Sequence, residues 1–442
     1  MERSANWSVA IVTALVFSYP ASSALSADLK MVTKAPPPAP PSWWSTLTID
    51  GYVEGGITGT SPKPADGINF GSLFTDKADR PLLNQALVTI QRPLDPKATG
   101  YDFGFKLQTL YGSDARSTQF LGEFAHSINS IDQFNIVEAY GIAHLPWLTS
   151  GGIDVKAGQY VTLEGAETIY ALTNPFYSHS YIFNFGIPFK HTGAMTITHV
   201  NSTIDIYAGI DTGVNTTFGN EIFPNGLPSA NNGDDNKAAA FHGGIALNNL
   251  FDGALTIMAT THIGPENPDT PAIAAACNCN PNGALRYLND VMATWTVNKQ
   301  LTLTTDLNYI RDDGFHATGG GAAQYAVYTI NDWLKFGVRG EIWRDNNSFF
   351  VAAFPGNFDF VNAELGLPNG SFTGGSTTYA EVTTGFTITP SVPTNPLGIK
   401  QVIMRPEIRY DTSLNGTTPF GGGTKSSQFT FAGDLIIPFT IK

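Results

Sequence analysis

From Thr46 onward, hydrophobic and polar residues alternate along most of the chain. In residues 101–111, aromatic and leucine side chains mostly alternate with polar ones, and residues 204–210, 301–308 and 334–342 repeat this pattern. A period of two is typical of a β-strand whose two faces meet different surroundings. The segments run to about ten residues, longer than most strands of globular sheets and close to the length of a tilted strand that crosses a bilayer. The pattern predicts an all-β chain of transmembrane strands.

About sixteen such segments follow one another, and short turns alternate with long connections between them, as in outer-membrane barrels. We expect the strands to begin near Thr46, Leu82, Tyr101, Gln133, Ile153, Phe189, Ser202, Ala238, Ala254, Leu285, Gln300, Ala322, Trp333, Thr377, Ile399 and Ser427. The expected long connections are 56–81, 113–132, 164–188, 212–237, 265–284, 312–321, 346–376 and 412–425.

Closure of the sheet follows from the surroundings, because lipid offers no hydrogen bonds and every backbone N–H and C=O must pair within the protein. We therefore predict a transmembrane antiparallel up-and-down β-barrel of about sixteen strands, with long extracellular loops and short periplasmic turns. An even strand number places both termini on the periplasmic side. A barrel of this size is wide enough to hold water.

Composition excludes the main alternatives. Charged residues are only 14% of the chain and aromatic residues are 12%. A soluble chain of this length needs more surface charge, typically about 25% of residues. No mature stretch reaches the roughly 18 uncharged apolar residues of a transmembrane helix. The net charge of −13 and the lack of a Lys/Arg cluster exclude nucleic acid as a partner.

The first residues have the pattern of an export signal. Arg3 is followed by an apolar run from Val9 to Phe17, then by Pro20 and small residues. We predict a cleaved signal peptide at 1–27, a Pro-rich periplasmic linker at 28–45 and an outer-membrane barrel at 46–442. The predicted location is the cell outer membrane.

Three stretches carry a family resemblance. Gly158-Gln-Tyr-Val-Thr, Asn174-Pro-Phe-Tyr-Ser-His-Ser180 and Phe183-Asn-Phe-Gly-Ile-Pro-Phe189, followed by His191-Thr-Gly, resemble the putative beta-barrel porin-2 (OmpL-like) family. The resemblance is sharpest over 158–193 and diffuse over the rest of 46–442. It implies a Gram-negative outer-membrane barrel with a pore role, and it implies no particular solute.

The sequence contains none of the searched catalytic or metal motifs: no GxSxG, HExxH, P-loop or paired-cysteine zinc pattern. The eight histidines are scattered singly, and we interpret His144, His242 and His262 as polar groups of the lumen. Cys277 and Cys279 are one residue apart, so a bond between them would close a very small strained ring, and we assign neither a role. We therefore predict no enzyme activity, no catalytic residue, no cofactor and no metal.

Charged residues on the predicted inward face would give a mixed lining, which admits water and small polar solutes. The alternative is that opposite charges neutralise each other across neighbouring strands. By the alternation, the inward acids are Asp50, Glu54, Asp102, Glu138, Asp154, Asp205, Asp290, Asp306, Glu341, Glu381, Glu407 and Asp434, and the inward bases are Lys106, Lys156, Arg286, Lys335, Arg339, Arg405 and Arg409.

The connection 164–188 differs from the other long ones because it is rich in aromatic and aliphatic residues. So many apolar groups are unfavourable in water, so the segment should pack against something. We predict that it folds into the lumen and narrows the pore. Burial at a subunit interface or against other loops is the alternative. The predicted constriction consists of Glu164 and Glu167 facing a basic strip of Arg339, Arg405 and Arg409.

These observations predict an outer-membrane porin, a water-filled channel for passive diffusion of small hydrophilic solutes. The alternative is a barrel that acts in adhesion, structure or binding through its long external loops. The predicted partners are outer-membrane lipid and lipopolysaccharide, small hydrophilic solutes or ions, and the outer-membrane assembly machinery. By analogy with other sixteen-stranded porins, they include copies of the chain itself in a homotrimer.

Overall fold

The computed structural model describes residues 43–441 except 97, 119–130, 215, 217–235, 237, 268, 270, 352–374, 394–398 and 400. No helix among these residues is long and apolar enough to cross a membrane. The predicted signal peptide and the linker up to residue 42 lie outside the described residues and stay predictions. The end of the linker forms a short 3-10 helix, η1 (Trp43–Thr46), whose Trp43 indole N–H donates to the Phe103 carbonyl at 2.9 Å.

All strands formed by the described residues belong to one antiparallel sheet. They are β1 (Thr48–Ser61), β2 (Leu82–Arg92), β3 (Asp102–Gly112), β4 (Gln133–Leu145), β5 (Ile153–Val161), β6 (Lys190–His199), β7 (Ile204–Asp211), β8 (Ala240–Asn249), β9 (Leu255–Pro265), β10 (Leu285–Thr296), β11 (Leu301–Asp312), β12 (Ala317–Asn331), β13 (Leu334–Asp345), β14 (Thr377–Ile388), β15 (Ile403–Met404), β16 (Glu407–Ser413) and β17 (Ser427–Thr440).

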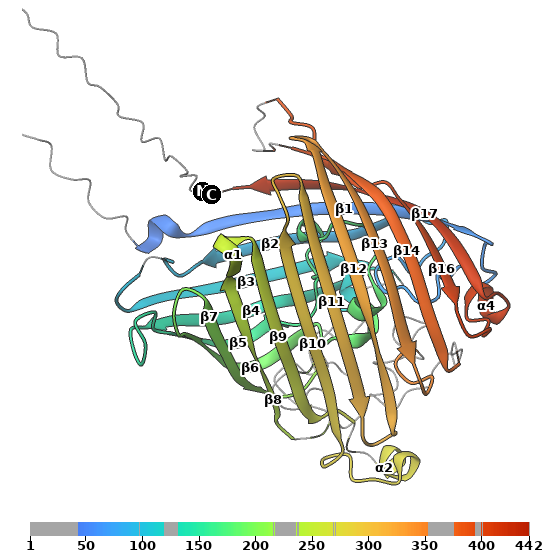
Figure 1. Ribbon diagram of the computed structural model, residues 1–442, viewed down its shortest axis with the longest axis horizontal. Helices are drawn as coiled ribbons and strands as arrows, with labels where there is room; N and C mark the ends of the chain where they lie inside the picture. The colour runs from blue at the N-terminus through green and yellow to red at the C-terminus, as the bar shows by residue number, and fades with distance from the viewer. Residues whose placement is uncertain are drawn as a thin grey trace, which may run out of the picture. The chain divides into compact units, whose positions relative to one another are not determined.

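The sheet is closed. β1 pairs with β2 on one side and with β17 on the other, where Gly51 lies opposite Phe439. These first and last strands run side by side in Figure 1. Closure leaves no strand edge for the lipid to meet, as the backbone of a membrane-spanning sheet requires.

The barrel has sixteen strands, as predicted, because β15 and β16 are two pieces of one strand. Both pieces pair with β14 and with β17. The break between them falls at Arg405 and Pro406, and proline has no N–H to donate to the ladder. The Arg405 N–H still donates to the Asp434 carbonyl at 3.2 Å, so the strand continues past the break.

Predicted strand starts coincide with observed ones at Leu82, Gln133, Ile153, Leu285, Thr377 and Ser427. The long connection expected at 312–321 is wrong, because β12 begins at Ala317 directly after a tight turn. The glycines at the start of β12 have no side chains and therefore conceal the hydrophobic–polar alternation. Gly319 and Gly320 nevertheless pair with Asp345 and Arg344 of β13.

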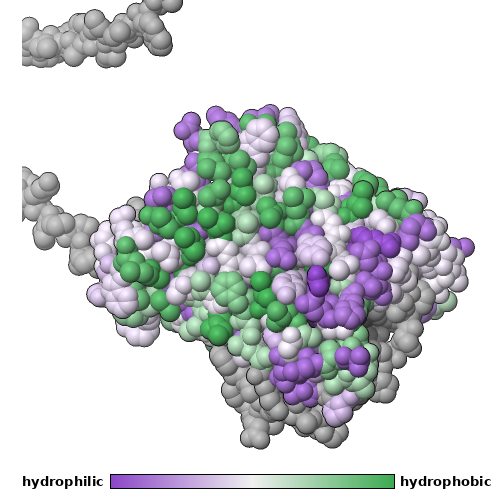
Figure 2. Space-filling view, turned by 60° about the horizontal axis from the view of Figure 1, so that its bottom comes forward, coloured by the Kyte–Doolittle hydropathy of each residue, from purple (hydrophilic) through white to green (hydrophobic). Residues whose placement is uncertain are grey.

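The outer surface of the barrel is apolar and the inner surface is charged. In β13, Ile342 is 55% exposed, whereas its neighbour Glu341 is 4% exposed. Figure 2 shows hydrophobic residues gathered over much of one outer face. This arrangement inverts that of a soluble protein and suits a barrel surrounded by lipid.

The hydrophobic core lies inside the barrel, where aromatic residues of two long connections meet. The rings of Phe74 and Phe183 lie 5.3 Å apart, and those of Phe183 and Phe189 lie 4.8 Å apart. Inward residues of the strands, such as Trp343 and Tyr379, complete this cluster. Connections, rather than strand side chains alone, therefore fill much of the interior.

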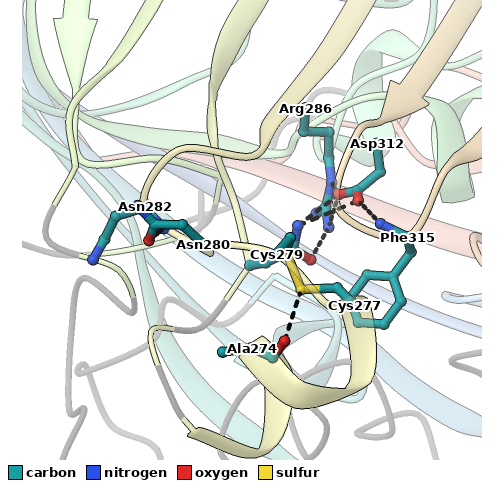
Figure 3. The surroundings of a disulfide bond; sticks show 9 residues. Ala274, Cys277, Cys279, Asn280, Asn282, Arg286, Asp312 and Phe315 are labelled. Atoms are coloured by element: carbon teal, nitrogen blue, oxygen red, sulfur yellow. Dashed lines mark hydrogen bonds and ion pairs between the residues drawn. A yellow bond between two sulfur atoms is a disulfide. The ribbon is translucent and has the colours of Figure 1, made fainter.

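Short helices occur only in connections among the described residues: η2 (Asp114–Arg116), η3 (Ala171–Thr173), the π-helix η4 (Ile182–Gly186), α1 (Leu250–Gly253), α2 (Pro271–Cys277) and α4 (Phe420–Gly423). At the end of α2, Cys277 and Cys279 form a disulfide (Figure 3). Their Cα atoms are 5.2 Å apart, within the usual range for a disulfide, so the expectation that the small ring disfavours the bond is wrong.

Candidate functional site

The connection 162–189, which we call the inner segment, lies inside the barrel. It contains η3 and η4, and most of its apolar side chains are buried against inward-facing residues of the wall, whereas Leu172 is exposed. Tyr170 reaches β4 through a hydrogen bond to Glu138 at 2.5 Å, and Asn308 of β11 donates to the Gly186 carbonyl at 3.0 Å. The segment thus contacts strands from different parts of the circumference.

Carboxylates of the wall accept hydrogen bonds from the backbone of the inner segment. Glu341 of β13 accepts from the N–H groups of Tyr181 and Ile182 at 2.6 and 2.8 Å. Glu407 of β16 accepts from those of Tyr177 and Ser178, with shortest distances of 2.8 and 3.1 Å. Irregular backbone that is buried at membrane depth must find such partners within the protein.

Arginines of the wall donate to the carbonyls of the same segment. Arg405 donates to the Ala171 and Asn174 carbonyls, each at 2.8 Å. Arg339 donates to the Ser178 carbonyl at 2.9 Å. The wall charges therefore replace the partners that a helix or a sheet would give this stretch of chain.

The arginines are also paired with carboxylates. Arg339 lies 2.6 Å from Glu167 and 2.5 Å from Glu381. Arg405 pairs with Asp434 and with Glu54. Each of these residues is at most 7% exposed.

Arg409 completes the group and pairs with Asp411 at 2.7 Å. Arg339 and Arg409 lie at the same level of the barrel, because both are register partners of Thr383. Arg339, Arg405 and Arg409 thus form a band on the strands that flank β14, which we call the arginine band, and neighbouring acids neutralise its charge.

Glu164 does not face the arginines, so that part of the prediction is wrong. The N–H groups of Gly165 and Ala166 donate to Asp290 and Asp306, which holds this end of the inner segment against β10 and β11. Burial raises the pKa of the Glu164 carboxyl well above its usual range, and the charges of Asp290 and Asp306 raise it further. Of the two predicted acids, only Glu167 lies against an arginine.

The connection 62–81 also enters the barrel, although the sequence predicted an external loop there. Phe70, Leu73 and Phe74 are buried, and the Leu73 N–H donates to the Asn184 side chain at 3.3 Å. The buried ion pair of Asp76 with Arg116, at 2.8 Å, links this connection to η2, which follows β3. The signal was present as the apolar residues of 69–74, in a stretch otherwise rich in glycine and polar residues.

Three inward lysines lie outside the arginine band. Lys335 is exposed and lies on the same face of β13 as Arg339. Lys106 pairs with Glu138 and lies 4.9 Å from the centre of the Tyr170 ring. Lys156 lies 4.8 Å from the centre of the Tyr140 ring.

Comparison with known sequences gives one family. The family described as putative beta-barrel porin-2, OmpL-like, matches residues 46–439. No curated protein matches the chain.

Comparison with solved structures gives barrels of the same fold. The outer membrane channel DcaP of Acinetobacter baumannii has a TM-score of 0.52 at 11% identity, covering 89% of this chain and 97% of that chain. An anion-selective porin from Comamonas acidovorans has a TM-score of 0.54 at 11% identity, covering 89% and 99%. OprB of Pseudomonas putida has a TM-score of 0.52 at 13% identity, covering 89% and 94%. These likenesses show the fold alone.

Proposed function

Since the chain belongs to the putative beta-barrel porin-2, OmpL-like family, we propose that it forms a water-filled channel in the outer membrane. Small hydrophilic solutes or ions would cross it by passive diffusion. The observation that supports this most is a closed sixteen-stranded wall with charged residues on the inside and apolar ones on the outside.

The inner segment is the proposed constriction of this channel. It crosses from Glu138 on β4 to Glu341 on β13, so it narrows whatever path remains. Glu167, Arg339, Arg405 and Arg409 would act by holding the segment in place. At the end that carries Glu164, the Gly165 and Ala166 N–H groups would hold the segment against β10 and β11.

The test is single-channel recording of the refolded protein in planar lipid. We expect steady conductance steps in the wild type. Deleting 166–177 removes part of the chain that fills the lumen, so it should raise the conductance several-fold. The barrel should still fold, because Arg405 keeps its ion pairs with Glu54 and Asp434. A folded barrel that gives no steps would contradict the channel and favour a binding or adhesion role.

Lys335→Gln is a matched variant for ion selectivity. In the wild type, the Lys335 side chain is exposed on the inner face and makes none of the described contacts with the inner segment. Removing this cation should shift the reversal potential in a salt gradient toward cations while the conductance stays close to that of the wild type. An unchanged reversal potential would place Lys335 outside the ion path.

The predicted assembly and partners remain proposals. We propose a homotrimer by analogy with other sixteen-stranded porins, with contacts to lipid and lipopolysaccharide and insertion by the outer-membrane assembly machinery. Native mass spectrometry of the detergent-solubilised protein measures the number of copies. A single-chain mass would contradict the trimer without affecting the channel proposal.

A further inference from the structure

Three histidines surround one carboxylate at the end of the barrel that carries the connections 162–189 and 212–239. His191 lies on β6, Asp211 ends β7, His242 lies on β8 and His262 lies on β9. All four are buried, with exposed fractions between 1% and 4%. Along the sequence these histidines are isolated, but strand pairing brings them together, and His242 is the register partner of His262.

Each imidazole directs one nitrogen at Asp211. His242 Nδ1 and His191 Nδ1 lie 2.6 and 3.0 Å from Oδ2, and His262 Nε2 lies 3.1 Å from Oδ1. The potential ligand atoms of His191, Asp211 and His242 all lie within 4.8 Å of one another. Two nitrogens and a carboxylate oxygen thus converge on one small volume, and His262 Nε2 lies beside the other oxygen of the same carboxylate.

The second nitrogen of each ring faces an oxygen. His191 Nε2 lies 3.2 Å from the Thr162 hydroxyl, and His242 Nε2 lies 3.1 Å from the Tyr160 hydroxyl. His262 Nδ1 lies 3.7 Å from the Glu266 carboxylate. Histidines that bind metals are oriented in this way, because the outer oxygen holds the proton on the far nitrogen and leaves the near nitrogen free to bind.

Some of these buried atoms lack a hydrogen bond. His191 Nδ1 faces Asp211 but forms none within the described part of the chain, and the same holds for His262 Nδ1 and Glu266 Oε1. A buried polar atom left without a hydrogen bond is unfavourable. A cation bound between the rings would be coordinated by His191 Nδ1 together with the Asp211 carboxylate.

We propose that His191, His242 and Asp211, with His262 as the fourth ligand, bind one divalent transition-metal ion. Imidazole nitrogen suits zinc and its first-row neighbours, and four nitrogen and oxygen ligands suit the tetrahedral geometry of Zn²⁺. The ligands come from four consecutive strands, so the ion would also fasten β6 to β9. Because the site is buried, the ion would be a resident of the wall rather than a passing solute.

The test uses Co²⁺ as a spectroscopic probe. The full chain is refolded in detergent with Co²⁺, free ion is removed, and bound metal is measured by mass spectrometry and visible absorption. We expect one Co²⁺ per folded chain, an absorption band typical of four-coordinate cobalt, and displacement by Zn²⁺. A folded wild type that retains no Co²⁺ would overturn the proposal.

Variants locate the ion. Asp211→Asn and His242→Gln should lose it, whereas Tyr160→Phe should bind it about 10-fold more weakly through loss of the outer oxygen. Folding of each variant is checked by its faster migration on unheated gels. Should Asp211→Asn fail to fold, His242→Gln and Tyr160→Phe still decide the outcome.

His199→Gln is the matched control. His199 and His144 also contact aspartates, but they alternate with Asp154 and Asp205 in a row instead of converging on one carboxylate. This variant should keep the ion with unchanged affinity. Loss of Co²⁺ in His199→Gln, or its retention in both Asp211→Asn and His242→Gln, would overturn the assignment.

Discussion

At the scale of single residues, Arg339 joins three parts of the protein. Its guanidinium contacts Glu167 of the inner segment and Glu381 of β14, and it donates to the Ser178 carbonyl. The side chain is fully buried. Such a group is stable only while every partner is present, since a lone buried carboxylate is strongly unfavourable.

Replacing Arg339 by Gln should therefore lower the free energy of unfolding by about 3–5 kcal/mol, the usual cost of breaking a buried ion pair. Urea unfolding followed by tryptophan fluorescence measures this change. Lys335→Gln, on the same face of the same strand but exposed, should unfold like the wild type. Equal unfolding midpoints for the two variants would show that Arg339 does not stabilise the barrel.

Asp114, at the start of η2, gives a prediction for pH. It accepts hydrogen bonds from Asn84 and Gln85, each at 2.9 Å, and burial raises the pKa of its carboxyl to about 6. The folded state thus holds this proton more tightly than the unfolded chain. The stabilisation that the protonated Asp114 carboxyl gives the folded state is complete below about pH 4 and is lost as the pH rises through about 6.

In Asp114→Asn this contribution disappears, so the free energy of unfolding should change less between pH 4 and 6 than in the wild type. Urea titrations at several pH values measure the slope. Asp66→Asn, at an exposed loop position, is the control and should keep the wild-type slope. A slope in Asp114→Asn equal to that of the wild type would contradict the shifted pKa.

Alternation along the strands was enough to assign Arg339, Glu341 and Arg409 to the inner face, but Asp345 and Asp411, which are also buried, were not assigned. It could not identify their partners. Glu341 bonds to Tyr181, far away in the sequence, and that pairing depends on strand register and on the path of the inner segment. The convergence of His191, His242 and His262 was not predicted, because it also depends on strand register.

At the scale of elements, strands with regular alternation were predicted almost to the residue, whereas glycine concealed the rest. Gly319 and Gly320 have no side chain to mark a face, so the start of β12 was taken for a loop. Glycine also matters where the inner segment approaches the wall. At Gly56 of β1, a Cβ atom would meet the ring of Tyr177.

Gly56→Ala should therefore displace Tyr177 and break its 2.9 Å hydrogen bond to Asn84. We expect faster cleavage of the inner segment in limited proteolysis of the folded protein. Gly59→Ala, on the same strand, meets only ordinary contacts and should resist protease like the wild type. Similar cleavage rates for all three proteins would mean that the segment tolerates the added methyl group.

At the scale of the whole molecule, closure depends on the pairing of β1 with β17. At Gly51, a Cβ atom would collide with the Leu87 carbonyl and with the ring of Phe439. The wild type should fractionate with the outer membrane and migrate faster on gels unheated than boiled, because a closed barrel has no edge for detergent to attack.

Gly51→Val should lose the fast-migrating band, whereas Gly340→Val, which has free space around its Cα, should keep it. Normal migration of Gly51→Val would show that closure tolerates bulk at this seam. Recovery of the wild type in the soluble periplasmic fraction would contradict the outer-membrane location itself.

The hydrogen bonds that hold the inner segment also determine the order in which parts of the barrel fold. The Tyr177 N–H meets Glu407 across 230 residues of sequence, and the Tyr181 N–H meets Glu341 across 160. Contacts between such distant parts of a chain form late, since the intervening loop must close first. While the last strands are still being added, the inner segment has no wall to receive it. A nascent barrel therefore passes through a stage that is more open than the finished one, and docking of this segment is among the last steps of its biogenesis.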